Sequence, residues 1–338
     1  MRWKGRRRSD NVEDRRGQRG TGGSRFPFPR SRGARRGGGM GIMGIVIVVG
    51  IMIFFPEFGK MIFGGGGGSG GSGFPGIELP RMPDSSTNRR ITPREREARR
   101  SSGVPRGGME DSQGAGGQQE RVSDQMRGFL SVVLADTEDV WANIFRRMGR
   151  TYKEPKMVMF SGSTRTACGV GMRQMGPFYC PSDQKIYIDT AFYTELSRKF
   201  GASGDFAQAY VIAHEVGHHV QTLLGITGKV QKYKMRYGQK SKKSNALQVR
   251  MELQADCFAG VWAKRADRAK NILERGDLEE ALNAANAIGD DKIQKRTTGY
   301  VVPDSFTHGS SRQRVGWFKR GFDQGDIANC DTFSSDIN

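Results

Sequence analysis

HEVGHH, at residues 214–219, places two histidines four positions apart. On a helix, positions i and i+4 project from the same face, so His214 and His218 can hold one metal ion between their imidazoles. Glu215 follows the first histidine and is offset around the helix, which brings its carboxylate near a water on that ion. The pattern predicts a zinc site of the metallopeptidase type, with Zn2+ as the cofactor.

A third protein ligand is needed, because a catalytic zinc takes three protein ligands and keeps its fourth position for water. Glu252 is the best candidate, since it begins ELQAD at 252–256 on a separate predicted helix. Asp256, one turn after Glu252, is expected to accept a hydrogen bond from a ligating imidazole and to fix its tautomer. The expected metal ligands are therefore His214, His218 and Glu252.

The expected chemistry assigns Glu215 the role of general base. Zinc lowers the pKa of a bound water toward about 7, so that Glu215 can take its proton and the hydroxide can attack a peptide carbonyl. The same carboxylate can then return the proton to the leaving amine.

The remaining histidines are read from their context. His308 lies in PDSFTHGSS, a loop-like stretch, and is expected to face the site and stabilise the oxyanion of the tetrahedral intermediate. A structural histidine or an additional metal ligand are the alternatives for His308. Tyr300 is an alternative oxyanion donor. His219, turned about 100° from His218 on the helix, is expected to pack or to lie on the surface.

The N-terminal region differs in composition from the rest of the chain. Residues 1–36 carry 13 Lys and Arg against 3 Asp and Glu with few aliphatic residues, which predicts a disordered basic arm. Residues 37–55 are uncharged and apolar apart from three leading glycines, long enough to cross a bilayer as a helix. A cleaved signal peptide and a buried core helix are the alternatives. Residues 56–120, rich in Gly, Pro and Ser, predict a flexible linker.

The basic arm also predicts orientation. Because cytoplasmic flanks carry the excess of basic residues, the N-terminus is expected in the cytoplasm and everything after residue 55 outside it. Contact with anionic lipid explains the arginines of the arm more simply than nucleic acid, so we expect no specific nucleic-acid partner. The expected location is the inner membrane, with a single span and a periplasmic or extracellular domain.

From residue 121 onward the hydrophobic pattern predicts an α+β domain, 121–338, with a small sheet packed on helices. The expected helices cover 122–148, 190–200, 205–224, 244–267 and 277–289, with a final amphipathic segment within 304–322. The expected strands are 156–160, 166–171, 176–180 and 185–189. A lysine-rich stretch, 229–243, is expected to connect two of the helices.

Four cysteines without C-x-x-C spacing argue against a structural zinc. An even number outside the cytoplasm favours two disulfides. Of the three connectivities we prefer Cys168 with Cys180, which joins neighbouring strands, and Cys257 with Cys330, which ties the C-terminal tail to the helix of Asp256. Buried free thiols are the alternative.

Four stretches carry a resemblance to a known family: HEVGHHVQ (214–221), ELQADCFAGVWA (252–263), VPDSFTHGSSRQRVGWF (302–318) and CDTF (330–333). They resemble the bacterial family called putative neutral zinc metallopeptidases over most of residues 121–333. The leader is outside this similarity, except as an anchor of the same general placement. The resemblance implies a zincin-like α+β fold, zinc as cofactor, His214, His218 and Glu252 as ligands, and a catalytic Glu215.

In zincins generally, extended substrate pairs with an edge strand beside the active-site helix, and residues 186–188 are the expected strand. Together these features predict a membrane-anchored, outward-facing zinc endopeptidase acting on a protein or peptide. Two other classes remain open: an inactive zincin that serves as an envelope scaffold or binding module, and an amidase or similar hydrolase acting on cell-wall peptides. The sequence indicates neither cleavage specificity nor oligomeric state.

Overall fold

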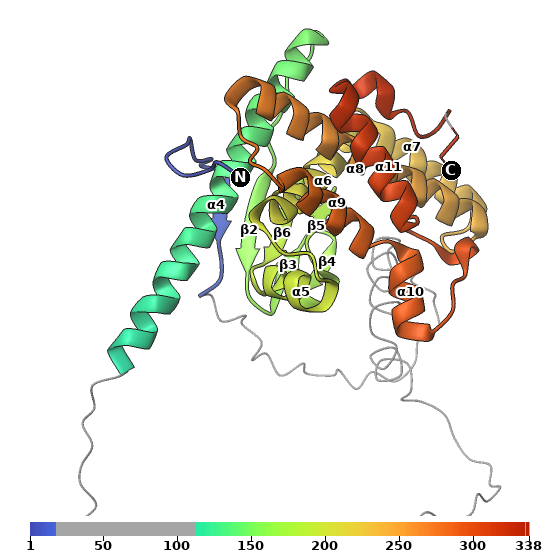
Figure 1. The fold of residues 1–338 in the computed structure, drawn as a ribbon. Coiled ribbons are helices and arrows are strands. Elements are labelled where there is room, and N and C mark those ends of the chain that lie inside the picture. Colours follow the sequence, from blue (N-terminus) through green and yellow to red (C-terminus); the bar gives the residue numbers. More distant parts are fainter. Residues whose placement is uncertain (18–111, 335, 338) are drawn as a thin grey trace, which may run out of the picture.

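The structure, a computed structural model, describes residues 1–17, 112–334 and 336–337 of the chain. Eight α-helices and two small sheets make up this part of the protein, which confirms the predicted α+β class (Figure 1). None of the helices in these ranges is long and apolar enough to cross a membrane. The predicted span at 37–55 lies outside the described residues.

Helix α4, Ser112–Arg147, begins ten residues before the predicted start and runs along one side of the domain (Figure 1). Its inner face carries Leu130, Val133, Leu134 and Trp141, none of which is exposed to solvent. Burying such a face against the other helices is the main source of stability of a long helix in water. The helix therefore begins at residue 112, within the stretch up to residue 120 that the sequence assigned to the linker.

The main sheet has four strands in the order β1-β2-β6-β5. The strands are β1 (Val12–Asp14), β2 (Lys156–Phe160), β6 (Lys185–Asp189) and β5 (Phe178–Cys180). Strands β1 and β6 run parallel to β2, and β5 runs antiparallel to β6. Strand β6 is thus an interior strand, so the prediction that residues 186–188 form the edge beside the site is wrong. Strand β5 is the edge on that side.

A two-stranded hairpin stands beside the main sheet. Its strands are β3, Ser163–Thr166, and β4, Gly169–Met172, which pair antiparallel. The sequence predicted one strand over 166–171, because the periodicity does not show the turn at Ala167 and Cys168.

Residues 1–17 form an arm that packs against the domain. Strand β1 pairs with β2 through Val12, whose Cα partner is Met157. The ring of Trp3 meets Phe129 of α4 edge-on, with centroids 5.6 Å apart. The predicted disorder over residues 1–36 is therefore wrong for the first seventeen, and the remainder of that range lies outside the described residues.

Ion pairs fix the same arm to α4. Arg6 reaches Asp136 at 2.9 Å and Arg7 reaches Asp139 at 2.7 Å. Buried Glu138 accepts a hydrogen bond from the Ser9 hydroxyl at 2.5 Å. These contacts place residues 1–17 against the domain, whereas the sequence predicted a membrane span between the two. The location of the arm and of the domain relative to a membrane stays a prediction.

Seven further helices follow β6, the last strand along the described part of the chain. They are α5 (Ala191–Phe200), α6 (Asp205–Leu223), α7 (Ile226–Tyr237), α8 (Lys242–Lys270), α9 (Asp277–Ala287), α10 (Asp290–Thr298) and α11 (Ser311–Gln324). Gly225, with φ of +78°, separates α6 from α7 at the predicted stop. The lysine-rich stretch 229–243 was predicted as a connection, but most of it is helical.

Two close helix contacts set the position of the histidine motif. A Cβ on Gly217 of α6 would lie 3.0 Å from the backbone of Ala255 on α8, and a Cβ on Gly321 of α11 would overlap the carbonyl of Cys257. Only glycine permits such approaches. They hold α6 and α11 against α8, so that HEVGHH, ELQAD and the start of α11 meet in space (Figure 1).

Both predicted disulfides are confirmed. Cys168 joins Cys180 with the Cα atoms 5.8 Å apart, and Cys257 joins Cys330 with the Cα atoms 5.6 Å apart. The second bond ties the C-terminal tail to α8 one residue after Asp256. All four cysteines of the chain are oxidised.

Candidate metal centre

The three predicted ligands converge on one point. Their donor atoms lie within 4.8 Å of one another. The Nε2 atoms of His214 and His218 lie 3.1 Å and 3.3 Å from Oε2 of Glu252. All three side chains are largely buried, and His214 and Glu252 are each 5% exposed.

The imidazoles are oriented by partners on their far nitrogens. Nδ1 of His214 lies 2.8 Å from Oδ1 of Asp256, and Nδ1 of His218 lies 2.9 Å from Oε1 of Gln221. Both partner oxygens are acceptors, so we assign the proton of each neutral ring to Nδ1 and a lone pair to Nε2. Two imidazole nitrogens and one carboxylate oxygen form the donor set of a catalytic zinc with an open fourth position. The residues present therefore fit zinc.

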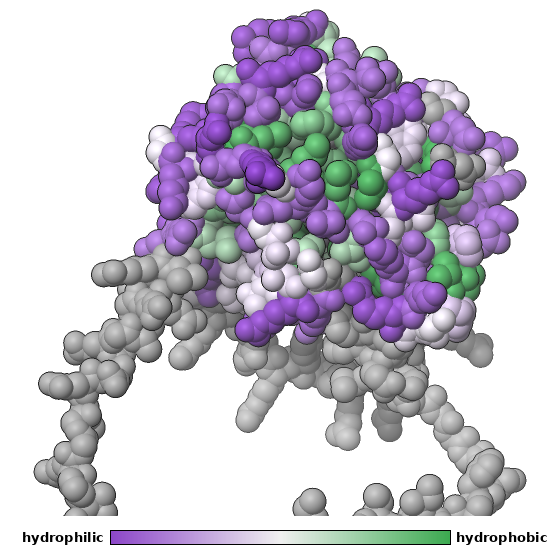
Figure 2. All heavy atoms as spheres, in the orientation of Figure 1, coloured by the Kyte–Doolittle hydropathy of each residue, from purple (hydrophilic) through white to green (hydrophobic). Residues whose placement is uncertain are grey.

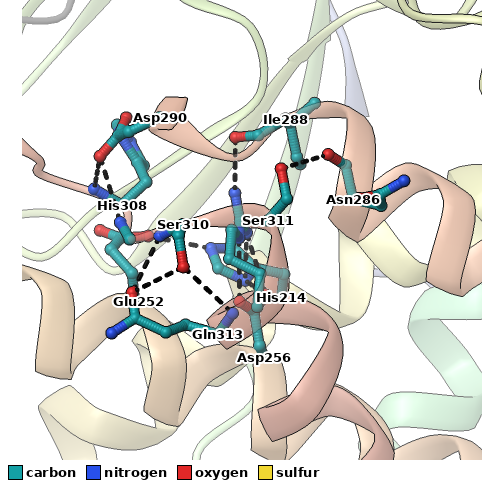
Figure 3. Close-up of polar contacts among 12 residues, drawn as sticks. His214, Glu252, Asp256, Asn286, Ile288, Asp290, His308, Ser310, Ser311 and Gln313 are labelled. Carbon is teal, nitrogen blue, oxygen red and sulfur yellow. Dashed lines mark hydrogen bonds and ion pairs between the residues drawn. The ribbon is translucent and has the colours of Figure 1, made fainter. Parts of the chain in front are cut away.

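Asp256 occupies the predicted place behind His214, and its carboxylate is fully buried (Figure 3). Arg314 of α11 donates two hydrogen bonds of 2.9 Å to the carboxylate, one to each oxygen. The hydroxyl of Tyr210 donates a third, of 2.6 Å, to Oδ1. Because each lone pair of a buried carboxylate needs a partner, this set of donors fixes the orientation of the oxygen that holds His214.

The charges around Asp256 compensate one another. Burial raises the pKa of Asp256, but the charge of Arg314, followed by that of His214, outweighs burial and lowers the pKa to about 2. Burial lowers the pKa of His214, but the charge and hydrogen bond of Asp256, together with the hydrogen bond to Glu252, outweigh burial, so the net direction is upward. A charged carboxylate in this position makes the histidine a more basic ligand.

Glu252 is supported by a buried chain of polar side chains. Gln248 donates to its Oε1 at 2.7 Å, and Lys234 of α7 donates to Gln248 at 2.8 Å. Lys234 is only 5% exposed, and burial lowers its pKa. This chain leaves Oε2 of Glu252 pointing at the histidines.

Glu215 lies beside the ligand cluster and is 7% exposed. Within the described part of the chain, its carboxylate makes no hydrogen bond, whereas its charge contributes, after burial and Glu252, to the pKa of His218. Tyr193 of α5 is buried close to Glu215. Burial raises the pKa of Tyr193, and the charge of Glu215 raises it further. Among the described residues, its hydroxyl has no hydrogen-bond partner. Glu215 is thus placed near the ligands without taking the position of one.

His308 lies on the loop before α11, over the same cluster (Figure 3). Asp290 holds this loop: its Oδ2 accepts the amides of Thr307, His308 and Gly309 at 2.6, 2.6 and 3.1 Å. Nδ1 of His308 lies 3.4 Å from Oδ1 of Asp290. The charge of His308 is one of the causes, after burial and the two ligand histidines, that act on the pKa of Glu252. The ring is therefore close to the centre but is not one of the converging ligands.

The two other candidates lie elsewhere. His219 is fully buried, between the hydroxyl of Tyr179 at 3.1 Å and the carbonyl of Lys153 at 2.6 Å, so it packs, as predicted. Burial lowers its pKa to about 4. Tyr300 is 66% exposed, which argues against a role as an oxyanion donor in a buried site.

The sequence prediction missed four supporting residues: Tyr210, Lys234, Gln248 and Arg314. Three of them occupy ordinary positions of helical patterns. Arg314 lies within the last family-like stretch, but an arginine on an amphipathic helix normally faces solvent. Only the packing of α11 on α8 turns it inward.

The candidate site consists of two histidines and a glutamate around one point, and buried partners orient each of them. This arrangement is typical of zinc peptidases. The sequence matches the family model described as putative neutral zinc metallopeptidase over residues 1–71 and 99–333. The chain belongs to this family. The family match includes the basic arm, which the resemblance drawn from the motifs had left out.

Relatives of the chain occur in distant bacteria. The uncharacterized protein YpfJ of Escherichia coli K12 is 45% identical over 346 residues, which cover the full length of both chains. The uncharacterized protein Rv2575 of Mycobacterium tuberculosis H37Rv is 46% identical over 194 residues, covering 54% of this chain and 64% of the relative. No solved structure matches the chain.

Proposed function

We propose that the protein is a zinc-dependent endopeptidase with a zincin-like domain. One observation carries the proposal: Nε2 of His214, Nε2 of His218 and Oε2 of Glu252 converge, while Glu215 lies beside them with a free carboxylate. Structural zinc sites are normally closed by four protein ligands, whereas three ligands and a neighbouring base suit hydrolysis.

When bound, zinc would supply Lewis-acid activation of the attacking water. Glu215 accepts the proton of that water and returns it to the leaving nitrogen of the peptide. His308 donates to the carbonyl oxygen as negative charge develops, and Asp290 keeps the histidine loop in place. The hydroxyl of Tyr193 is available as a further donor beside Glu215.

An extended peptide is the substrate class that fits the edge of the sheet. Strand β5 ends the sheet on the side of the centre and touches α6, where Tyr179 contacts His219. An extended chain can add to such an edge through main-chain hydrogen bonds, which are independent of side chains. We propose that substrate pairs with β5 in place of the strand first expected.

We further propose that residues 37–55 attach the protein to a membrane and that the domain works outside the cytoplasm. Two disulfides support an oxidising compartment. The packed arm, residues 1–17, would lie on the same side as the domain.

Cleavage of an unfolded, fluorescently labelled protein by the full-length, zinc-loaded chain tests the activity. Glu215→Ala should lower the rate at least about a hundredfold, the usual contribution of a general base, without loss of zinc. Glu279→Ala, which changes an exposed glutamate of α9, is the matched control and should behave as wild type. Full zinc content without cleavage that depends on Glu215 would favour the scaffold instead.

A further inference from the structure

One face of the molecule combines exposed apolar side chains with basic ones. Among the described residues, eight large hydrophobic side chains are exposed, and six of them lie on α7 or on the loop after α10. These six are Tyr233, Met235, Tyr237, Tyr300, Val301 and Val302. We call them, with the basic residues around them, the α7 face. In the space-filling view, green side chains among purple ones mark the lower right, where the loop after α10 runs in Figure 1 (Figure 2).

The two segments of the α7 face meet at the start of α8. Lys243 lies over the ring of Tyr237 at 4.9 Å, and Lys242 pairs with Asp304 at 2.9 Å, just after the loop of Val301. The rings of Tyr233 and Tyr237 stack with centroids 6.4 Å apart. Tyr233 and Tyr237 are therefore neighbours, and the start of α8 joins them to the loop of Tyr300, Val301 and Val302.

The segment of this surface that includes α7 carries charge of one sign. Residues 229–243 carry seven Lys and Arg and no Asp or Glu. Six of the seven are exposed, namely Lys229, Lys232, Arg236, Lys240, Lys242 and Lys243. The seventh, Lys234, points inward to Gln248 and so toward Glu252. Helix α7 thus supports the metal centre with one face and presents a basic, partly apolar face to solvent.

We propose that the α7 face docks on the surface of a bilayer that contains anionic lipid. Amphipathic helices of this composition lie in the headgroup region, with lysines near the phosphates and tyrosines at the level of the interface. Basic residues near such a surface each add attraction, because anionic lipids give it a negative potential. Docking would hold the metal centre close to the membrane, and it does not require the centre to be active.

The link to residues 37–55 does not select a face by itself. At about 3.4 Å per residue, residues 56–111 could extend roughly 190 Å and residues 18–36 roughly 65 Å, so neither link restricts docking to one side of the domain. Chemistry must therefore decide which side docks. A bilayer surface offers anionic headgroups to the lysines and an apolar region below them to the exposed apolar side chains. An acidic polypeptide would complement only the charge of this face.

Full-length protein in lipid nanodiscs tests the proposal. Met235→Cys can be labelled with an environment-sensitive fluorophore, because all four native cysteines are oxidised. The probe should shift to the blue in discs with phosphatidylglycerol and be quenched by a quencher in the lipid, and neither effect should occur in neutral discs. A probe at Val170→Cys, which is 56% exposed on β4, should not respond.

Charge variants make the test independent of folding. Replacing Lys229, Lys232, Arg236 and Lys240 with Gln should lower the docked fraction at least about tenfold. The control has the same change of net charge and replaces Arg146, Arg147, Lys153 and Lys156 with Gln. Equal loss in both variants, or no shift with anionic lipid, overturns the proposal. A shift produced by a soluble polyglutamate in neutral discs, and not by anionic lipid, assigns the face to an acidic polypeptide instead.

Discussion

Arg314 offers the sharpest test of how the centre is held. Its guanidinium is 3% exposed and donates to both oxygens of Asp256 at 2.9 Å, and also to Tyr210 at 3.2 Å. Arg314→Met keeps much of the side-chain length but removes the charge and the donors. Asp256 then stays buried with only Tyr210 and His214 as partners.

The magnitude follows from the burial. Removing one partner of a buried ion pair costs about 3 to 5 kcal/mol of folding free energy, because the other charge stays desolvated. Losing the group that orients a ligating histidine lowers metal affinity about tenfold to a hundredfold. Arg314→Lys keeps the charge but cannot make the two parallel bonds, so it should recover only part of each loss.

Two assays separate these effects. Urea unfolding of the metal-free protein measures the folding cost, and competition with a chelator measures the Kd for zinc. Arg312→Met, an exposed arginine one half-turn earlier on the same helix, is the matched control. If Arg314→Met and Arg312→Met have the same unfolding free energy and the same Kd, Arg314 does not hold Asp256 in the way described.

Three further predictions concern other parts of the molecule. Replacing Cys257 and Cys330 with Ser should cost about 4 kcal/mol in urea unfolding, since the bond closes 73 residues; an unchanged midpoint would contradict this. Asp290→Ala should slow cleavage while zinc content stays constant. The pKa of Asp290 is lowered, because its hydrogen bonds to the histidine loop outweigh burial. The ionised carboxylate therefore stabilises the fold above the unfolded pKa of about 3.9, and this contribution is lost as the pH falls further. Asp290→Asn should lack this acid-sensitive part of the unfolding free energy. In spheroplasts, an impermeant maleimide should label Asp10→Cys and Lys229→Cys equally, and labelling of one alone would separate arm from domain.

The sequence predicted which three side chains converge, because the signals for them are local. The spacing of His214 and His218 needs only one helix, and the step from Glu252 to Asp256 needs only one more. The contact between the two helices is tertiary and cannot be read from periodicity. A catalytic zinc needs a third protein ligand, however, and this requirement pointed to Glu252. The cysteine pairing was similarly limited to three choices.

The contacts that were not predicted are those between distant segments. Strand β1 pairs Val12 with Met157, which lies 145 positions away. The arm is also too polar for its hydrophobic pattern to predict a strand. Its stability comes from the carboxylates of α4 and the edge of β2, which the composition of residues 1–36 does not reveal. The order of the strands is likewise unrelated to periodicity, so β6 could be recognised as a strand but not as an interior one.

The coordination of zinc tests the central claim most directly. X-ray absorption at the zinc edge of the full-length protein should show two imidazole nitrogens and light oxygen donors at about 2.0 to 2.2 Å, with no sulfur. In Glu252→Ala, one oxygen donor should be lost or the metal should be absent. Zinc with sulfur ligands, or a wild-type spectrum that Glu252→Ala leaves unchanged, would contradict a centre built from His214, His218 and Glu252.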